Sequence, residues 1–101
     1  MPASAHAIIV KSEPQAGAVL AGPEIAIAFT YNVRIDAERS KLTLIAADGT
    51  ARDVAIVPDE APDMLKGIAA GIAPGAYVLR WQVLASDGHI TRGDVPFSIA
   101  P

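Results

Sequence analysis

The chain has 101 residues, a net charge of -3 and no cysteine, and 51% of its residues are hydrophobic while 19% are charged. This composition predicts a single folded domain with a core of its own, and it excludes disulfides, thiolate metal sites and cysteine nucleophiles. The acidic balance without any basic cluster argues against nucleic acid as a partner, and no apolar run approaches the roughly 18 residues that a membrane span requires.

The start of the chain has the features of a processed secretory protein. Ala3-Ser4-Ala5 is typical of the small-residue cleavage site that ends a signal peptide, although the charged start and apolar stretch of such a peptide are missing. We therefore expect residues 1–5 to be a signal-peptide remnant or an added tail, with the domain spanning residues 6–101. Cleavage before His6 would give this residue a free α-amine beside its imidazole.

Short apolar runs predict β-strands in the first part of the chain. Residues 7–11 form a short apolar strand, and residues 12–17 form a turn in which Pro14 fixes φ and Gly17 permits a positive φ. The next strand is opened by Ala21-Gly22-Pro23, and alternate apolar side chains predict that one of its faces is buried. That face consists of Ile25, Ile27 and Phe29.

A β-hairpin is predicted in the middle of the chain. Leu42 and Leu44 alternate before Asp48-Gly49, a strong hairpin dipeptide, and Val54 and Ile56 lie on one face of the returning strand.

The segments that flank this hairpin are expected to be irregular. Residues 35–42 have a pattern that allows one short helical turn, and residues 58–62 form a polar loop bounded by two prolines. Asp59, Glu60 and Asp63 give this loop a negative charge. They lack the ligand spacing and central glycine of a calcium-binding hand, which favours a solvated loop.

The longest predicted strand follows Pro74-Gly75, and a second hairpin follows at Asp87-Gly88. Two apolar faces are expected to be buried here, one formed by Tyr77, Leu79, Trp81 and Val83 and the other by Val95, Phe97 and Ile99. Pro96 lies inside the closing strand and indicates an edge or a bulge. The recurring short strands predict an all-β sandwich or barrel of about seven strands.

The only two histidines stand in positions that suggest metal binding. His6 is a plausible mature N-terminus, and Asp87 and His89 supply a carboxylate and an imidazole within Ser86-Asp87-Gly88-His89. A nitrogen-rich set with one oxygen suits Cu(II) in tetragonal geometry. The competing interpretation is that Asp87-Gly88 is only a turn and that His89 is a surface residue without a function.

Four stretches of the chain resemble a CopC-type periplasmic copper-binding domain of bacteria. They are His6–Pro14 with Gly17, Ile27–Thr30, Leu42–Leu44 with Asp48-Gly49, and Pro74–Val83 continuing into Ser86–His89; the tail Gly93–Ile99 fits as well. The resemblance implies a small Greek-key, immunoglobulin-like β-sandwich.

The resemblance also implies a ligand set. Cu(II) would be held by the amine and ring of His6, by the carboxylate of Asp87 and by the imidazole of His89. It further implies an inner-membrane copper transport protein as the partner, a periplasmic location and a monomeric carrier.

Three departures from the family pattern bear on function. Five residues precede His6, and while they remain its nitrogen is an amide and not an amine. Met64 is the only methionine besides Met1, so we expect one Cu(II) site and no methionine-rich Cu(I) site. Tyr31 stands where family members often have an acidic residue.

We therefore expect a copper carrier or buffer in copper homeostasis or resistance, and not an enzyme. The alternatives are an immunoglobulin-like structural or interaction module with a vestigial metal site, and an oxidative copper enzyme. Trp81 is expected in the core. Arg80 and Arg92 flank the Asp-x-His turn in sequence, and we expect them to be surface residues more than partners of Asp87.

Overall fold

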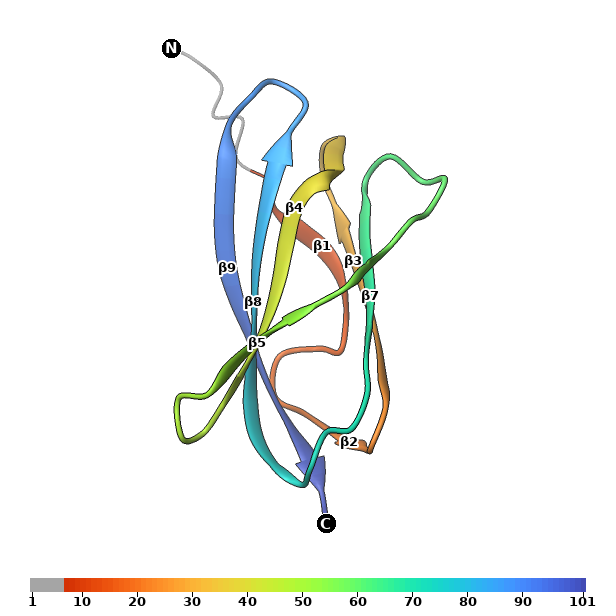
Figure 1. The fold of residues 1–101 in the computed structure, drawn as a ribbon. Coiled ribbons are helices and arrows are strands. Elements are labelled where there is room, and N and C mark those ends of the chain that lie inside the picture. The colour runs from red at the N-terminus through yellow and green to blue at the C-terminus, as the bar shows by residue number, and fades with distance from the viewer. Residues whose placement is uncertain (1–6) are drawn as a thin grey trace.

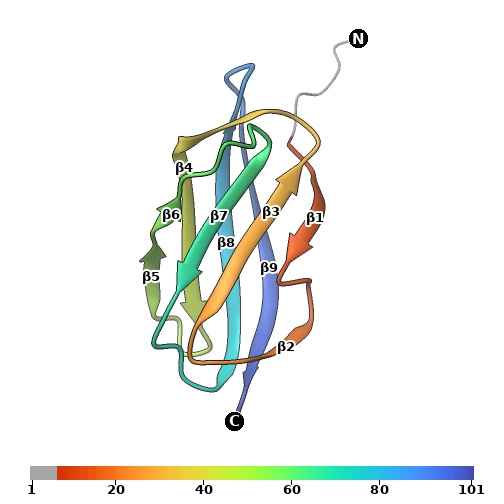
Figure 2. The same ribbon diagram turned by 90° about the vertical axis from the view of Figure 1, so that its right-hand side faces the viewer.

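A computed structural model of the protein describes residues 7–101 and shows two β-sheets packed face to face (Figures 1 and 2). No helix in this part of the chain could span a membrane. The strands are β1 (Ile9–Glu13), β2 (Ala18–Ala21), β3 (Ile25–Tyr31), β4 (Ile35–Ala46), β5 (Ala51–Val54), β6 (Ile56–Val57), β7 (Met64–Ala69), β8 (Gly75–Ala85) and β9 (Ile90–Ala100).

The first sheet, sheet A, has the order β1-β3-β7-β6, and the second, sheet B, has the order β2-β9-β8-β4-β5. Figure 2 shows sheet A in front of sheet B. All neighbouring strands are antiparallel except β2 and β9, which are parallel. This order is that of an immunoglobulin-like sandwich, which confirms the predicted fold class.

Within residues 7–101 the structure has nine strands where the sequence predicts about seven, because one predicted strand is divided between the two sheets and the short strands β2 and β7 were not predicted. The predicted strand with Val54 and Ile56 on one face is divided: Val54 ends β5 in sheet B and Ile56 belongs to β6 in sheet A. The chain crosses at Ala55, and Gly67 permits the crossing, since a Cβ there would lie 3.1 Å from the Ala55 carbonyl oxygen. Alternation keeps both apolar side chains turned inward, so the pattern cannot reveal the change of sheet.

The helical turn expected within residues 35–42 is wrong. β4 runs through this segment with an irregularity between Asp36 and Lys41. The Ser40 hydroxyl donates a 2.7 Å hydrogen bond to the Asp36 carbonyl and accepts one of 3.3 Å from the Leu84 amide. A side-chain hydroxyl thus stabilises a β-bulge in the segment for which the apolar spacing had suggested a turn of helix.

The inward faces predicted from alternation form the core. They are contributed by Ile25, Ile27 and Phe29 from β3, by Leu42 and Leu44 from β4, by Leu79, Trp81 and Val83 from β8, and by Val95, Phe97 and Ile99 from β9. Tyr77 is half-buried and stacks on Phe97. The short strands β2 and β7 were not predicted, because Ala18–Ala21 and the glycine-interrupted Met64–Ala69 carry little alternation.

Pro96 lies at a point where β9 has a strand partner on one side only. The parallel pairing with β2 begins at Phe97, and the Pro96 carbonyl accepts a 2.7 Å hydrogen bond from the Gly17 amide on that side. The imide nitrogen faces the same side, so no ladder hydrogen bond is lost. The register of β8 and β9 is continuous here, so the predicted edge is confirmed and the bulge is not present.

Trp81 packs between the two sheets near the β8–β9 turn. It faces Gly93 on β9, where an added Cβ would lie 2.4 Å from the indole ring. It also packs against the Tyr31 ring in a T-shaped arrangement, with centroids 5.2 Å apart. This layer of aromatic rings supports the end of the sandwich that carries Asp87 and His89.

Candidate metal centre

The predicted turn at Asp87-Gly88 connects β8 to β9 at one end of the sandwich (Figure 1). The Gly88 amide donates to the Ala85 carbonyl at 2.9 Å, and the Ala85 amide donates to the His89 carbonyl at 2.8 Å. Gly88 has a φ of 94°, a conformation that glycine adopts without steric cost. The hairpin therefore fixes the backbone of the two candidate ligands that flank this glycine.

Asp87 and His89 contact each other directly. Asp87 Oδ1 accepts the His89 amide at 3.0 Å, and Asp87 Oδ2 lies 2.9 Å from His89 Nδ1. The backbone hydrogen bond from His89, followed by the side-chain one, lowers the pKa of the Asp87 carboxyl. An ionised carboxylate only accepts hydrogen bonds, so Nδ1 is the donor in this contact and Nε2 is the ring nitrogen left for another partner.

The pair is open to solvent, with side-chain exposures of 68% for His89 and 38% for Asp87. An incoming ion can therefore reach both groups. Within residues 7–101 no third histidine or acidic side chain joins them to make a group of three potential ligands. The two donors fit Cu(II) chemically, but the described residues alone do not complete a site. The remaining predicted ligand, His6, lies outside the described residues.

The beginning of the described chain is held next to this turn. The Ala7 amide donates a 3.2 Å hydrogen bond to Thr91 Oγ1, two residues after His89, and Ala7 is buried. Asn32 then holds Ile8 on both sides, since its Oδ1 accepts the Ile8 amide at 2.8 Å and its own amide donates to the Ile8 carbonyl at 3.0 Å. These contacts join the start of the chain to β9 and to the β3–β4 connection.

The sequence prediction missed Thr91 and Asn32 as positioning residues. A weak sequence signal did point to Thr91. By alternation it lies on the same inward face of β9 as Val95 and Phe97, and it is the polar residue of that face. No sequence signal pointed to Asn32, since its role depends on a contact with Ile8, 24 residues away in the chain.

The arginines near the turn serve other partners, which confirms their expected surface role. Arg80 binds Asp94 with two hydrogen bonds of 2.9 and 3.1 Å, and Arg92 donates to the Gln82 side chain at 2.7 Å. The Arg80 hydrogen bond lowers the pKa of Asp94.

Tyr31, which departs from the acidic residue that family members often have at this position, is buried with its ring against Trp81. Burial raises the pKa of its phenol well above the ordinary value. Among residues 7–101 its hydroxyl has no hydrogen-bond partner. Tyr31 therefore remains a neutral phenol and supplies no negative charge to the turn.

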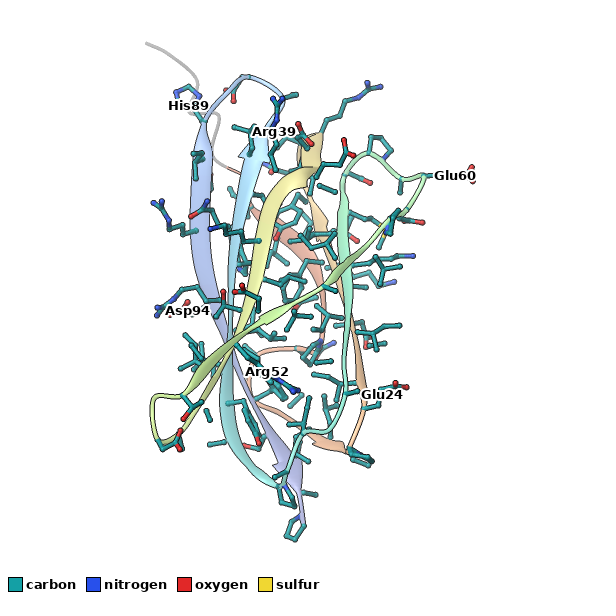
Figure 3. The ribbon with its side chains drawn as sticks, in the orientation of Figure 1. Glu24, Arg39, Arg52, Glu60, His89 and Asp94 are labelled. Carbon is teal, nitrogen blue, oxygen red and sulfur yellow. The ribbon has the colours of Figure 1, made fainter. Side chains whose placement is uncertain are left out.

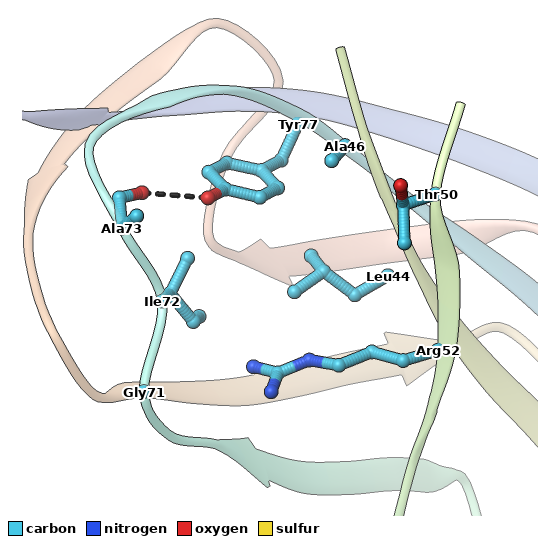
Figure 4. A pocket seen from close by; sticks show the side chains of 8 residues that line it. All are labelled: Leu44, Ala46, Thr50, Arg52, Gly71, Ile72, Ala73 and Tyr77. Carbon is cyan, nitrogen blue, oxygen red and sulfur yellow. Dashed lines mark hydrogen bonds between the residues drawn. The ribbon is translucent and has the colours of Figure 1, made fainter. Parts of the chain in front are cut away.

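A cavity of about 220 Å³ lies at the opposite end of the sandwich, beside the β4–β5 hairpin (Figure 4). Its polar side chains already bind backbone carbonyls: Arg52 donates to Ala70 and the Tyr77 hydroxyl donates to Ala73, both at 2.6 Å. Its lining contains no imidazole or carboxylate. The cavity thus lacks the donors of a metal site.

The sheet order and the last hairpin define an immunoglobulin-like β-sandwich domain that presents a carboxylate and an imidazole at one end. The CopC domain model matches residues 9–100. The chain therefore belongs to the CopC family, which confirms the resemblance. Asp87 and His89 lie within the matched range and His6 precedes it.

Solved structures agree with this assignment. CopC from Methylosinus trichosporium OB3b has 25% sequence identity and a TM-score of 0.84, with 95% of each chain covered. PcoC from Escherichia coli, described as a methionine-rich copper resistance protein, has 25% identity and a TM-score of 0.78, with 94% of this chain and 99% of that one covered. Murine CRIg, at 11% identity and a TM-score of 0.53, shares the fold alone. A comparison with curated proteins gave no match.

Proposed function

We propose that this protein is a periplasmic Cu(II) carrier or buffer that acts in copper resistance or homeostasis and is not an enzyme. The ligands are the α-amine and imidazole of mature His6, the imidazole of His89 and the carboxylate of Asp87. Family membership and the copper resistance role in the name of PcoC support the metal. The donor chemistry supports the oxidation state, since two imidazoles and an amine with one carboxylate suit Cu(II).

The observation that carries this proposal is the anchor at Ala7. Its amide hydrogen-bonds to Thr91, two residues from His89. Consecutive Cα atoms are about 3.8 Å apart, so an N-terminal residue joined to Ala7 has the metal-binding turn within reach. Both histidines can then serve one ion although 83 residues separate them in the sequence.

The proposed role of Asp87 requires a local exchange of partners. Oδ2 now lies at hydrogen-bond distance from His89 Nδ1, whereas Oδ1 accepts the His89 amide. When Oδ2 turns to the metal, the amide hydrogen bond still holds the carboxylate in the hairpin. Because the carboxyl pKa is lowered, Asp87 stays ionised in mild acid. The amine, with a reference pKa of about 8, then sets the loss of affinity as pH falls.

A signal peptide that ends at Ala5 would direct the protein to the periplasm, and its cleavage would give His6 a free α-amine. We propose that the mature carrier is a monomer. The metal would pass between it and an inner-membrane copper transport protein. Met64 and Met1 are too few for the thioether site that the name of PcoC suggests for that protein. We therefore propose a single Cu(II) site and no methionine-rich Cu(I) site.

The test is a Cu(II) titration against a competing chelator, read out by Trp81 fluorescence, with chains 1–101 and 6–101 compared. His89→Ala and Asp87→Ala should abolish tight binding of one equivalent by the shorter chain. Asp48→Ala is a matched control, because Asp48 caps the other Asp-Gly turn through a 2.9 Å hydrogen bond from the Thr50 amide and has no histidine beside it. If neither chain competes with the chelator, the proposed function is wrong. Tight Cu(I) binding would refute the single-site proposal.

A further inference from the structure

A groove of about 760 Å³ opens on the side of the sandwich between β4 and the β6–β7 loop. Most of its lining, here called the floor, is apolar and consists of Ile35, Ala37, Ile56, Pro58, Ala61, Pro62 and Met64. Its volume lies within the range of about 300–1,000 Å³ that is usual for ligand sites. Ile35, Ala37 and Ile56 also pack against the core, and neither Asp87 nor His89 lines the groove.

The groove exists because both sheets lose their outer strand at the same level. β5 pairs with β4 only at Leu42–Ile45, and β6 pairs with β7 only at Gly67 and Lys66. The early part of β4 and the start of β7 therefore have no neighbouring strand on this side in the described chain, and at the β4 edge the Ile35 amide is already bonded to the Pro62 carbonyl of the loop. Open strand edges of this kind accept an extended peptide through backbone hydrogen bonds.

Both walls of the groove are held in place. The Ile35 amide donates a 2.9 Å hydrogen bond to the Pro62 carbonyl, and a Lys66–Asp59 ion pair of 3.4 Å ties the loop to β7. On the opposite wall, Ser40 fixes the bulge through its bonds to Asp36 and Leu84. The groove is thus preformed, so binding of a ligand does not carry the entropic cost of ordering it.

The rim of the groove is acidic. Asp36, Glu38 and Asp59 line it and no lysine or arginine does, although Asp59 is already paired with Lys66, which leaves Asp36 and Glu38 to face a partner. Arg39 lies 3.9 Å from Asp36 and is 76% exposed, so that pair is weak. Figure 3 shows Glu60 at the tip of the loop on the same side. The surface therefore complements positive charge above an apolar floor.

We infer that this groove docks an extended segment of a partner protein in which lysine or arginine alternates with aliphatic residues. The aliphatic side chains occupy the floor, and the basic ones meet Glu38 and Asp36. Electrostatic complementarity of this kind selects partners and speeds their encounter.

The groove lies at the end of the sandwich that carries the candidate metal ligands. Ile35 pairs with Ala85, and the Ser86 amide donates a 3.0 Å hydrogen bond to the Arg34 carbonyl. Figure 3 shows Arg39, Glu60 and His89 at this end. A partner held in the groove therefore lies at the same end of the sandwich as the Asp87–His89 turn. The docking site itself does not depend on the proposed copper function.

The probe is an acetylated hexapeptide that alternates valine with lysine or arginine, compared with a twin in which glutamate replaces each basic residue. Binding to the metal-free protein, kept in EDTA, is followed by NMR shifts of the amides of residues 7–101. We expect shifts at Ala37, Glu38 and Ala61 with the basic peptide alone. Glu38→Lys should weaken binding of the basic peptide by about tenfold, because it removes one charge pair in a partly desolvated groove.

Glu24→Lys is the matched control, because Glu24 is exposed, carries the same charge and lies at the other end of the sandwich (Figure 3). It should leave the affinity for the peptide nearly unchanged, as should His89→Ala. Shifts outside the groove, equal binding of the acidic twin, or no binding would each overturn the inference. Since copper is absent, failure here is separate from failure of the proposed function, which the Cu(II) titration measures.

Discussion

Replacing Gly93 with alanine should destabilise the protein through a single contact. The new Cβ would lie 2.4 Å from Cζ2, 2.6 Å from Cε2 and 2.8 Å from Nε1 of Trp81, whereas relaxed carbon contacts are about 3.5–4.0 Å. The indole must therefore move by about 1 Å to reach that separation. The indole has little free space around it, because Trp81 is 6% exposed and the 2% exposed Tyr31 packs against it.

The magnitude follows from two opposing effects. Overpacking a core costs about 1–3 kcal/mol, and a rigid aromatic ring against a strand backbone belongs at the upper end. Alanine recovers about 0.5–1 kcal/mol relative to glycine within a strand. We expect Gly93→Ala to lower the free energy of unfolding by about 2 kcal/mol, measured by urea denaturation with far-UV circular dichroism.

A double-mutant cycle identifies the contact. Trp81→Phe removes the indole atoms that clash, and on its own it should cost about 1–2 kcal/mol for the space it leaves. In the Trp81→Phe background, Gly93→Ala should then cost almost nothing. If the two losses simply add, the contact with Trp81 is not the cause and the reasoning is refuted.

Three further substitutions test other parts of the structure. Tyr31→Phe removes a buried hydroxyl that has no partner among residues 7–101, so thermal and urea unfolding should show unchanged or raised stability, by up to about 1–2 kcal/mol; a marked loss would reveal a partner. Thr91→Val removes the acceptor of the Ala7 amide and should weaken Cu(II) binding by the 6–101 chain about fivefold in the chelator competition, and unchanged affinity would show that the anchor does not position the site. Asp94→Asn should cost at most about 1 kcal/mol at pH 7, since its pair with Arg80 is exposed. Because Arg80 lowers the pKa of Asp94, the stabilisation is complete above the unfolded value of about 3.9 and disappears as pH falls through the lower folded value; a stability difference that does not shrink as pH falls below the unfolded value would contradict this assignment.

Much of the fold could be predicted from the sequence because it depends on local rules. Alternation identified the buried faces of β3, β8 and β9, and the Asp-Gly dipeptides identified both hairpins. The Asp87–His89 pair could be found as well, because its two members lie within one turn.

The sequence alone determined an all-β sandwich with two Asp-Gly hairpins and an imidazole beside a carboxylate in the second. Only the tertiary structure decided that the chain changes sheet at Ala55 and that Ser40 holds a bulge in β4. The tertiary structure also decided that the Ala7 amide is hydrogen-bonded to Thr91 beside the turn, and that an acidic groove opens where both sheets lose their outer strands. Alternation reports which way a side chain faces within its own strand. It carries no information on which strand lies opposite, and contacts between residues distant in the chain depend on that pairing.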